Sequence, residues 1–387
     1  VETHGDFNTI HDTHLDTDLD THPDTDLDTH LDSDLATAVF RDRYGVTKAG
    51  NFEGATVLTR ARSVDTVADD HGLDVAETES LLAAAGDAVR TARAGRPRPP
   101  RDEKVLAGWN GLMVSAFAEA GIVLDGEYAD RATAALTFLR EHLWDEHADR
   151  LDRRYKDGDV GIPGYLEDYA FLGRGALDTY QATGDVDHLA FALDLARAVE
   201  AEFWDAEEET LYFTPASGED LIARPQELDD SSTPSSAGVA AELLASLQHF
   251  TPRDDFGEIA EAVVRTHGDR LAADPLQHAS LTLAADEIRH GSLELTIAAA
   301  EPPADWLDTI GDRYLPARLL APRPPTEAGI EEWLDRLDME EAPPIWADRS
   351  VRDGEPTVYA CRSFACSPPL GDLEEALDWA DSNLASE

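Results

Sequence analysis

Three clusters of polar and aromatic residues share one place in the sequence pattern, because each stands at the start of a segment with helical spacing of apolar residues. Their members are Lys104, Trp109 and Asn110; Tyr165, Glu167 and Asp168; and Asp229, Asp230 and Ser235. If the helices stack side by side, all three clusters lie at the same rim. Carboxylates, an amide and aromatic rings that converge from different helices are the groups that form a pocket for a polar ligand.

The chemistry available to this set is acid–base catalysis on a hydroxyl-rich molecule. Two carboxylates from different helices can divide the acid and base roles when their surroundings separate their pKa values. We assign these roles to Asp168 and Asp230, supported by Glu167. An aromatic face stacks on a sugar ring, and Asn and Asp bind its hydroxyls. The residues expected to hold the substrate are Lys104, Trp109, Asn110, Tyr165, Asp229 and Ser235.

Each of these residues also has an ordinary structural interpretation. Ser235 follows a proline and is typical of a helix N-cap. Several of the carboxylates would favour a helix N-terminus electrostatically, namely Glu167, Asp168, Asp229 and Asp230. Two aromatic residues occur at spacings that suit a helical core, Trp109 and Tyr169. The shared position of the three clusters is what favours the functional interpretation.

A repeat positions the clusters. The segment Leu143-Trp144-Asp145 recurs 60 residues later as Phe203-Trp204-Asp205, and each copy has two helices followed by an acidic turn. The expected helices lie near 105–121 and 127–143, near 165–183 and 187–203, and, in a looser third copy, near 235–249 and 255–272, with another near 276–288. Such hairpins bury one face against their neighbours and form a solenoid or a toroid. The two Trp-Asp pairs lie at the opposite end of the hairpins and are expected to be structural turns.

The other segments differ in composition. Residues 1–35 alternate His or Asp with Thr and Leu, which predicts a low-complexity, disordered tail. Residues 36–102 are expected to be a linker with helices, residues 103–290 the hairpins, and residues 291–387 an α/β appendage with strands near 293–299, 317–321 and 357–361. In the appendage, Cys361 and Cys366 have a C-x4-C spacing that matches neither a zinc site nor a C-x-x-C redox motif. We therefore expect ordinary buried packing for both.

Composition and charge exclude several classes of partner. The chain has 387 residues, 80 acidic against 31 basic, a formal net charge of −49 and 42% hydrophobic residues. A globular core with so acidic a surface is typical of a cytoplasmic protein adapted to high salt. Nucleic acid is excluded because its phosphates would be repelled, and no apolar run reaches the roughly 18 residues of a membrane span. We expect no cofactor and no metal, since no corresponding motif is present.

Five segments, taken together, resemble a known family. They are RYGVTKAGNFEGATVL (43–58), EKVLAGWNGLMVSAFAEAG (103–121), LEDYAF (166–171), residues 229–236 and VYACRSFACSPP (358–369). In this order they are similar to the YyaL-type thioredoxin-domain-containing family, which is related to spermatogenesis-associated proteins. The resemblance runs from about Phe40 to the C-terminus. It implies an (α/α)6 toroid similar to N-acylglucosamine 2-epimerases and six-hairpin glycosidases, and a role in carbohydrate metabolism.

The chain also departs from that family. The thioredoxin-like domain is absent, and about six or seven helices are expected in the body where a closed ring takes twelve. We therefore expect a mainly α protein, an incomplete (α/α)6 toroid with a small C-terminal α/β element, that corresponds to the C-terminal half of a family member. The implied activity is epimerisation, isomerisation or hydrolysis of a sugar. Two alternatives stay open: a non-catalytic module that pairs with itself or with a separately encoded N-terminal half, and a thioredoxin-linked redox protein that uses Cys361 and Cys366.

Overall fold

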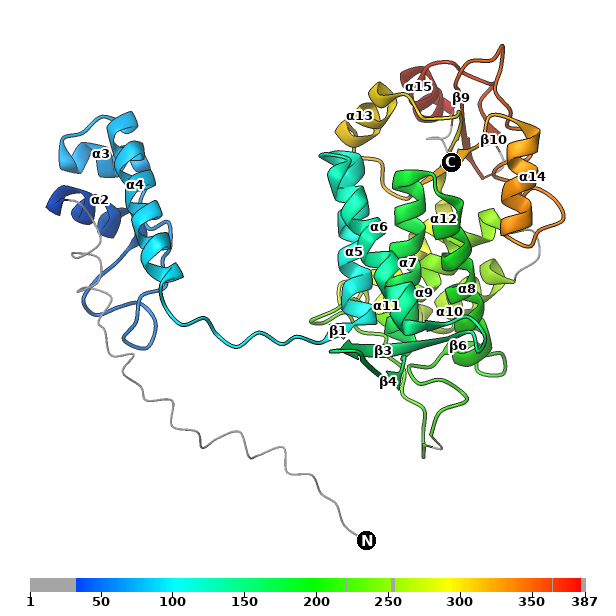
Figure 1. Ribbon diagram of the computed structural model, residues 1–387, viewed down its shortest axis with the longest axis horizontal. Coiled ribbons are helices and arrows are strands. Elements are labelled where there is room, and N and C mark those ends of the chain that lie inside the picture. The colour runs from blue at the N-terminus through cyan, green and yellow to red at the C-terminus, as the bar shows by residue number, and fades with distance from the viewer. Residues whose placement is uncertain (1–32, 220, 252–254, 364, 384–387) are drawn as a thin grey trace, which may run out of the picture. The chain divides into compact units, whose positions relative to one another are not determined.

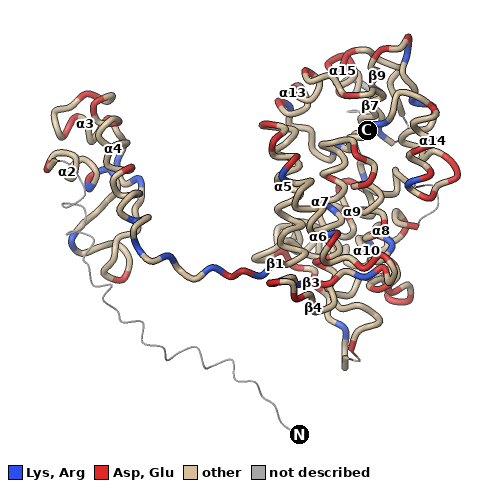
Figure 2. The backbone as a smooth tube through the Cα atoms, viewed as in Figure 1, with Lys and Arg blue, Asp and Glu red and all other residues tan. Residues whose placement is uncertain are grey.

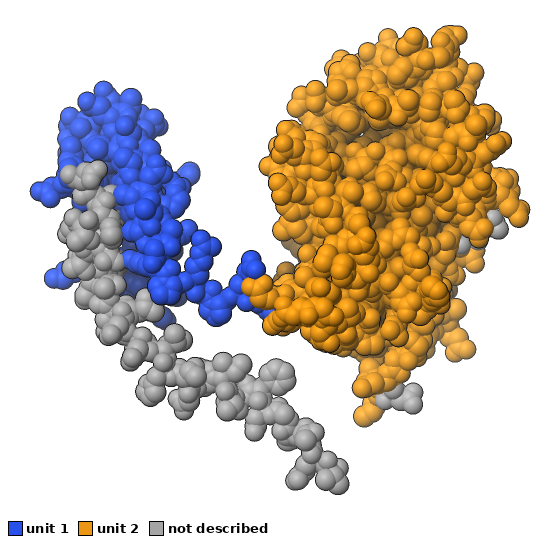
Figure 3. Space-filling model, viewed as in Figure 1, with its two compact units in different colours: residues 1–102 blue, residues 103–387 orange. Residues whose placement is uncertain are grey.

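The computed structural model describes residues 33–219, 221–251, 255–363 and 365–383, and the chain divides into two compact units, residues 1–102 and 103–387 (Figure 3). Asp and Glu residues occur all along the backbone of both units (Figure 2). The predicted disordered tail lies outside the described residues, apart from its last three. Among the described residues, no helix combines the length and the apolar character needed to cross a membrane.

The described part of unit 1, residues 33–102, contains three helices, α2 (Asp34–Tyr44), α3 (Val64–His71) and α4 (Val75–Ala94). Each helix starts at a polar N-cap, and α4 has a full capping box formed by Asp74 and Glu77. The three helices bury a small apolar core. Its fully buried members are Val39, Phe40, Val46, Val67, Leu82 and Ala85.

Unit 2 contains helical hairpins in series (Figure 1). The first helix of each hairpin packs against the first helix of the next, and the second helix packs on its own partner. The helices are α5 (Ala107–Val123), α6 (Glu127–Leu143), α7 (Leu166–Thr183), α8 (Val186–Phe203), α9 (Ser236–Leu247), α10 (Phe256–Thr266), α11 (Gly268–Ala273) and α12 (Ala279–His290). The described residues thus contain three consecutive hairpins followed by the short α11 and by α12, which confirms the predicted fold class of an incomplete ring of hairpins.

Short strands lie at the end of the hairpins where α5, α7 and α9 begin (Figure 1). They are β1 (Val105–Leu106), β2 (Trp144–Asp145), β3 (Arg150–Lys156), β4 (Asp159–Pro163), β5 (Trp204–Asp205) and β6 (Thr210–Leu211). The repeat is visible in their register, because Trp144 pairs with Leu151 as Trp204 pairs with Leu211. The Trp-Asp pairs are therefore strands that close a β-hairpin and not turns. They lie at the end where the first helices begin, which corrects the predicted placement at the opposite end. Strand β3 joins β1 to β2, which fixes the start of α5 relative to the end of α6.

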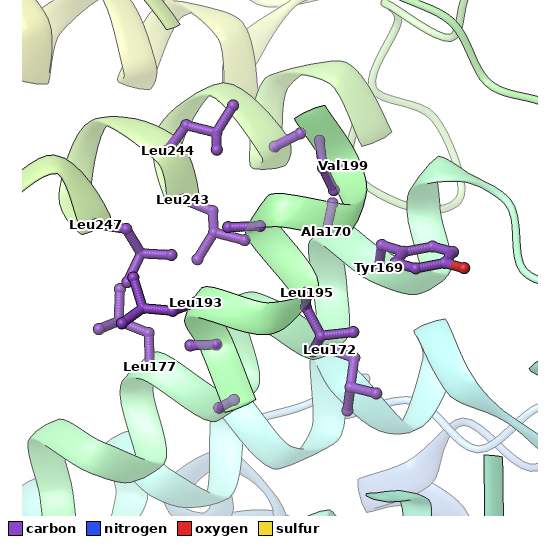
Figure 4. Close-up of a cluster of buried hydrophobic side chains, with 14 of the residues drawn as sticks. Tyr169, Ala170, Leu172, Leu177, Leu193, Leu195, Val199, Leu243, Leu244 and Leu247 are labelled. Atoms are coloured by element: carbon purple, nitrogen blue, oxygen red, sulfur yellow. The ribbon is translucent and has the colours of Figure 1, made fainter. Parts of the chain in front are cut away.

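The core of unit 2 is centred on α7, which is buried along almost its whole length. Leucines of α7, α8 and α9 interdigitate there, among them Leu172, Leu193 and Leu243 (Figure 4). Glycines let α5 and α7 approach closely, because a Cβ on Gly111 would lie 2.5 Å from the backbone nitrogen of Leu172. Helix α7 is thus held on both sides. Its N-terminus therefore has a fixed position at the end of the hairpins where the predicted clusters lie, which we call the rim.

The C-terminal element is a small sheet with helices. Its strand order is β10-β9-β7-β8, in which β7 and β8 are parallel. The elements are β7 (Leu293–Ala298), α13 (Ala304–Asp312), β8 (Arg318–Arg323), α14 (Glu327–Arg336), β9 (Thr357–Arg362), β10 (Ala365–Cys366) and α15 (Leu373–Asn383). The sheet is attached to α7 by a hydrogen bond of 2.7 Å from the Tyr180 hydroxyl to the Pro322 carbonyl.

The two cysteines differ from their prediction. Cys361 and Cys366 form a disulfide, whereas the sequence predicted ordinary buried packing. The reason is the register of the β9–β10 hairpin, which places the two residues directly opposite each other with their Cα atoms 4.1 Å apart. A spacing of C-x4-C becomes a disulfide only when a hairpin turn folds between the cysteines, and the sequence did not specify that turn.

Candidate active site

The side chain of Asp168 joins the starts of two hairpins. Its Oδ1 accepts a hydrogen bond of 2.9 Å from the N–H of Gly108 at the start of α5. Its Oδ2 accepts one of 3.0 Å from the N–H of Tyr165, which forms part of the capping box of α7. The first two polar clusters, which the sequence placed at one rim, therefore meet at this carboxylate.

Arg153 reaches the same carboxylate from strand β3. Its Nη1 lies 2.7 Å from Asp168 Oδ2 and 2.6 Å from Glu167 Oε1. The side chain of Asp168 is 1% exposed and that of Glu167 is 10% exposed, so water and salt screen these pairs little. Burial raises the pKa of Asp168 above its ordinary value, although Arg153 and the two N–H groups favour the charged form. Because structural partners occupy both of its oxygens, we assign Asp168 to holding the rim together.

Glu227, which the sequence analysis did not single out, is the carboxylate at this rim with an unused oxygen. Among the described residues, its Oε2 and the Oγ of Ser236 at the start of α9 are buried without a hydrogen-bond partner. Burial raises the pKa of Glu227, the nearby charge of Glu167 raises it further, and the Ser236 hydroxyl and Arg153 oppose the rise. The Ser236 hydroxyl is thus close without meeting hydrogen-bond geometry. A carboxyl with a raised pKa, Glu227, beside an arginine-paired Glu167 is an arrangement suited to acid–base chemistry.

Backbone bonds fix the segment that carries Glu227. Leu166 at the start of α7 donates to the carbonyl of Phe213 (2.9 Å), and Phe213 in turn donates to the carbonyl of Pro225 (2.8 Å). Ser235 is the N-cap of α9: its Oγ accepts from the N–H of Gly238 and donates to the Glu227 carbonyl. An open cavity of about 390 Å³ borders this segment, and its lining residues are Gln226, Glu227, Leu228, Asp229, Ser231 and Arg270.

The aspartates of the third cluster are bound to the start of α12. Asp230 Oδ2 accepts from the N–H of Ser280 (3.0 Å), and its Oδ1 accepts from the Ser280 hydroxyl and from the N–H of Ser235. Asp229 is exposed and accepts from Gln277 Nε2 at 3.0 Å. Asp230 therefore ties the loop before α9 to α12, while Asp229 lines the cavity. The acid–base role of Asp230 stays a prediction.

The predicted substrate-binding residues lie in different surroundings. Tyr165 is covered on its ring faces, since it stacks on Phe213 at 4.9 Å and carries the Arg153 guanidinium 5.3 Å from its centroid. Asn110 donates to the Leu106 carbonyl within its own helix start. Lys104 is exposed just before β1, and Trp109 is 60% exposed. Of the two predicted aromatic residues, Trp109 is the one that leaves a face open for a ligand.

A second charged cluster, which the sequence did not reveal, lies between the first helices of the hairpins. Arg174 contacts Asp178 through Nε (3.0 Å) and Glu242 through Nη1 (2.6 Å), and Asp178 also accepts from the Ser115 hydroxyl. Burial raises the pKa of Asp178, and it does the same for Glu287 of α12. These side chains come from α5, α7, α9 and α12, so the cluster braces the four helices internally. Within the described residues no group of His, Cys, Asp and Glu is arranged to hold a metal ion.

The fold and the rim define the class of protein as a partial ring of helical hairpins with polar groups at one end. No family model matches the chain. Human spermatogenesis-associated protein 20 is 30% identical over 352 residues, which cover 85% of this chain and 44% of the relative. A Caenorhabditis elegans protein, B0495.5, is 24% identical over 334 residues, which cover 84% of this chain and 44% of the relative. The chain thus spans under half the length of these curated relatives, and over the aligned part the predicted resemblance to the spermatogenesis-associated protein family is confirmed.

Solved structures with a similar arrangement of helices have little sequence in common with this chain. A glycoside hydrolase of family 105 from Clostridium acetobutylicum has a TM-score of 0.36 at 10% identity, with 53% of this chain and 61% of the other covered. A D-mannose isomerase has a TM-score of 0.35 at 11% identity, and the alignment covers 68% of this chain and 70% of the isomerase. An α-1,6-mannanase of Salegentibacter has a TM-score of 0.34 at 16% identity, and the alignment covers 60% of this chain and 69% of the mannanase. Scores this low carry no argument about the reaction, which has to come from the chain's own residues.

Proposed function

We propose that the rim site binds a sugar and acts on it by acid–base catalysis, with Glu227 as the acid and the arginine-paired Glu167 as its partner. The observation that carries the proposal is the buried, unpartnered Oε2 of Glu227 beside a second carboxylate that Arg153 holds. Glu227 lines the cavity of about 390 Å³, and Asp229 lines it too. Trp109 adds an exposed ring of the kind that stacks on sugars. The broad class agrees with the carbohydrate metabolism that the family resemblance implies.

The roles follow from the surroundings of each carboxyl. A raised pKa keeps Glu227 protonated to higher pH, so it can donate a proton to a sugar oxygen. Glu167 is held by Arg153 Nη1 at 2.6 Å, and its carboxylate can accept a proton or stabilise a positive charge that develops on the sugar. Asp168 and Asp230 keep these groups in place through their bonds to α5, α7 and α12. The reaction is hydrolysis or isomerisation, according to whether the proton goes to a glycosidic or a carbonyl oxygen.

The test is turnover by the full chain and by Glu227→Gln. In molar potassium chloride, which screens the surface charge, we expect the chain to act on at least one member of a panel of nitrophenyl glycosides and free aldoses. Glu227→Gln should lower kcat by about 10²–10⁴, the usual contribution of a positioned acid. It should also abolish the fall in activity on the high-pH limb of the profile, because that fall reports deprotonation of Glu227. The matched control is Glu207→Gln, a carboxylate exposed in the turn after β5. A panel without turnover, or equal kcat for the wild type and Glu227→Gln, would refute the proposal.

The surface of α5 favours a second candidate, a docking face for a second copy of this chain. Met113 is 55% exposed, Val123 is 46% exposed, and Trp109 lies on the same helix. The sequence of α5 is apolar on every side, AGWNGLMVSAFAEAGIV, as is typical of a helix buried all round. A symmetric dimer that covers this face would explain the apolar residues that the described structure leaves exposed.

Self-association is measured by light scattering on a sizing column in molar potassium chloride. We expect a discrete dimer for the wild type and a monomer for Met113→Glu, because a charge buried in the contact is costly. Leu276→Glu is the control, since Leu276 is 86% exposed in the turn before α12, outside α5, and its substitution should leave the dimer intact. A wild-type monomer, or a dimer that survives Met113→Glu, would exclude α5 as the contact.

A further inference from the structure

The disulfide between Cys361 and Cys366 has a cation directed at both of its sulfurs. Arg349 Nη2 lies 3.0 Å from Cys366 Sγ and 3.4 Å from Cys361 Sγ. The same guanidinium donates to the Ala347 carbonyl through Nη1 and lies 5.5 Å from the centroid of the Tyr359 ring. Its Nε is buried without a partner, and among the described residues no carboxylate forms a salt bridge with Arg349.

This arrangement favours the reduced state of the sulfurs. A disulfide is neutral and leaves the cation of Arg349 without a counter-charge in a half-buried position. A thiolate at either sulfur would form an ion pair with that cation, and a positive charge beside a cysteine lowers its pKa and makes it reactive. A buried disulfide that served only to cross-link the hairpin would gain nothing from the arginine. We propose that Cys361 and Cys366 form a dithiol–disulfide exchange site whose partner is an external dithiol, and that Arg349 stabilises the thiolate.

The surroundings of the hairpin suit exchange. Strand β10 is at the edge of the sheet, and Cys366 on it is half-buried, whereas Cys361 on β9 is 2% exposed. The hairpin does not depend on the disulfide, because Ser367 donates its N–H to the Ala360 carbonyl (2.8 Å) and accepts from the Ala360 N–H through Oγ (3.1 Å). The segment that carries Arg349 is anchored separately, since Tyr359 donates through its hydroxyl to the Ser350 carbonyl. Both sulfurs and the cation therefore stay together after reduction.

The exchange proceeds in two balanced steps. A thiolate of the external dithiol attacks the more accessible Cys366 sulfur, a mixed disulfide forms, and Cys361 leaves as a thiolate beside Arg349. The second thiol of the partner, once deprotonated, attacks the partner's first sulfur in the mixed disulfide, and Cys366 is released as a thiolate. The partner ends as a disulfide, its two electrons reduce the cysteines, and its two protons are taken up by the thiolates or by solvent. The reverse sequence oxidises the cysteines and reduces the partner.

The proposal is tested on the full chain with dithiothreitol as the dithiol. The protein is equilibrated in molar potassium chloride at graded ratios of reduced to oxidised dithiothreitol, the thiols are trapped with iodoacetamide, and they are counted by mass spectrometry. We expect both thiols to appear together while tryptophan fluorescence stays native. Arg349→Met should need at least a tenfold higher ratio for half-reduction, and alkylation of its reduced form should reach half its maximal rate about one pH unit higher. Arg349→Lys retains the charge and should stay near the wild type.

Arg352→Met is the matched control, because Arg352 is exposed three residues away and, within the described part of the chain, donates no hydrogen bond to either sulfur. It should behave as the wild type in both measurements. Three results would overturn the proposal: equal reduction of the wild type and Arg349→Met, loss of native fluorescence before either thiol appears, or alkylation of the cysteines before any reductant is added. Each of these readouts is independent of sugar turnover, so the exchange site and the rim site succeed or fail separately.

Discussion

Replacing Arg153 with methionine is expected to lower the free energy of unfolding of unit 2 by about 3–5 kcal/mol at neutral pH, the usual effect of removing one partner from a buried ion pair. The substitution leaves Asp168, 1% exposed, and Glu167, 10% exposed, with no guanidinium between them. Two carboxylates would then repel each other at the point where β3 meets α7. Because Arg153 is 19% exposed, some water reaches the site, and the lower end of the range is the better expectation.

The loss should grow with pH. The pKa of Asp168 is already above its ordinary value of 3.8 in the folded chain, and without Arg153 it rises further. A raised pKa means that the folded state holds the proton more tightly than the unfolded state. The associated stability is fully present below pH 3.8 and is lost as the pH rises through the folded pKa. Arg153→Met should therefore differ little from the wild type near pH 4 and most at neutral pH.

The control for this prediction is Arg154→Met on the same strand. Arg154 pairs with Asp159, a carboxylate that is 71% exposed, and surface pairs of this kind contribute about 0–1 kcal/mol. Urea unfolding followed by tryptophan fluorescence reports unit 2 alone, because all seven tryptophans follow residue 102. Equal losses for the two variants, or a loss at Arg153 that does not depend on pH, would contradict the structural role of the buried pair.

The hairpins were predictable because their signals are local and repeated. The Trp-Asp pairs, the helical spacing and the 60-residue shift place α5 to α8 within two residues of their bounds. The convergence of the clusters at one rim also followed, since first helices that stack in parallel bring their N-termini together. The bond between Gly108 and Asp168, 60 residues apart, is a direct expression of that repeat.

The roles within the site were not predictable from these signals. Whether Asp168 and Asp230 are available for catalysis depends on partners far along the chain, such as Ser280, 50 residues from Asp230. Arg153 lies in a strand that sequence patterning did not identify, and Glu227 lies in a loop without periodicity. The same holds for Arg349 and the two cysteines, whose contact exists only in the register of β9 and β10. In each case a long-range contact decides the chemistry, and a local sequence pattern does not show which distant residues come into contact.

Substitution of Gly111 by alanine is expected to lower the free energy of unfolding of unit 2 by about 1–3 kcal/mol, the range for overpacking of a core. In an exposed helix the same Gly→Ala change would raise the free energy of unfolding by up to about 1 kcal/mol. The direction of the change in stability therefore reports whether the two helices are in close contact. The added Cβ would lie 2.5 Å from the nitrogen of Leu172 and 2.6 Å from the carbonyl carbon of Phe171. These are backbone atoms of a buried helix, and they can move only if α5 and α7 separate.

Separation of α5 from α7 would also lengthen the bond between Gly108 and Asp168, so Gly111→Ala should reduce ligand binding at the rim as well as stability. Gly126→Ala is the matched control, because a Cβ there meets no atom within 4 Å and the backbone is already in the right-handed helical region. Its unfolding midpoint should stay close to that of the wild type when followed by tryptophan fluorescence. A stabilising effect of Gly111→Ala would show that the two helices are not in close contact, and the shared rim would then lose its structural basis.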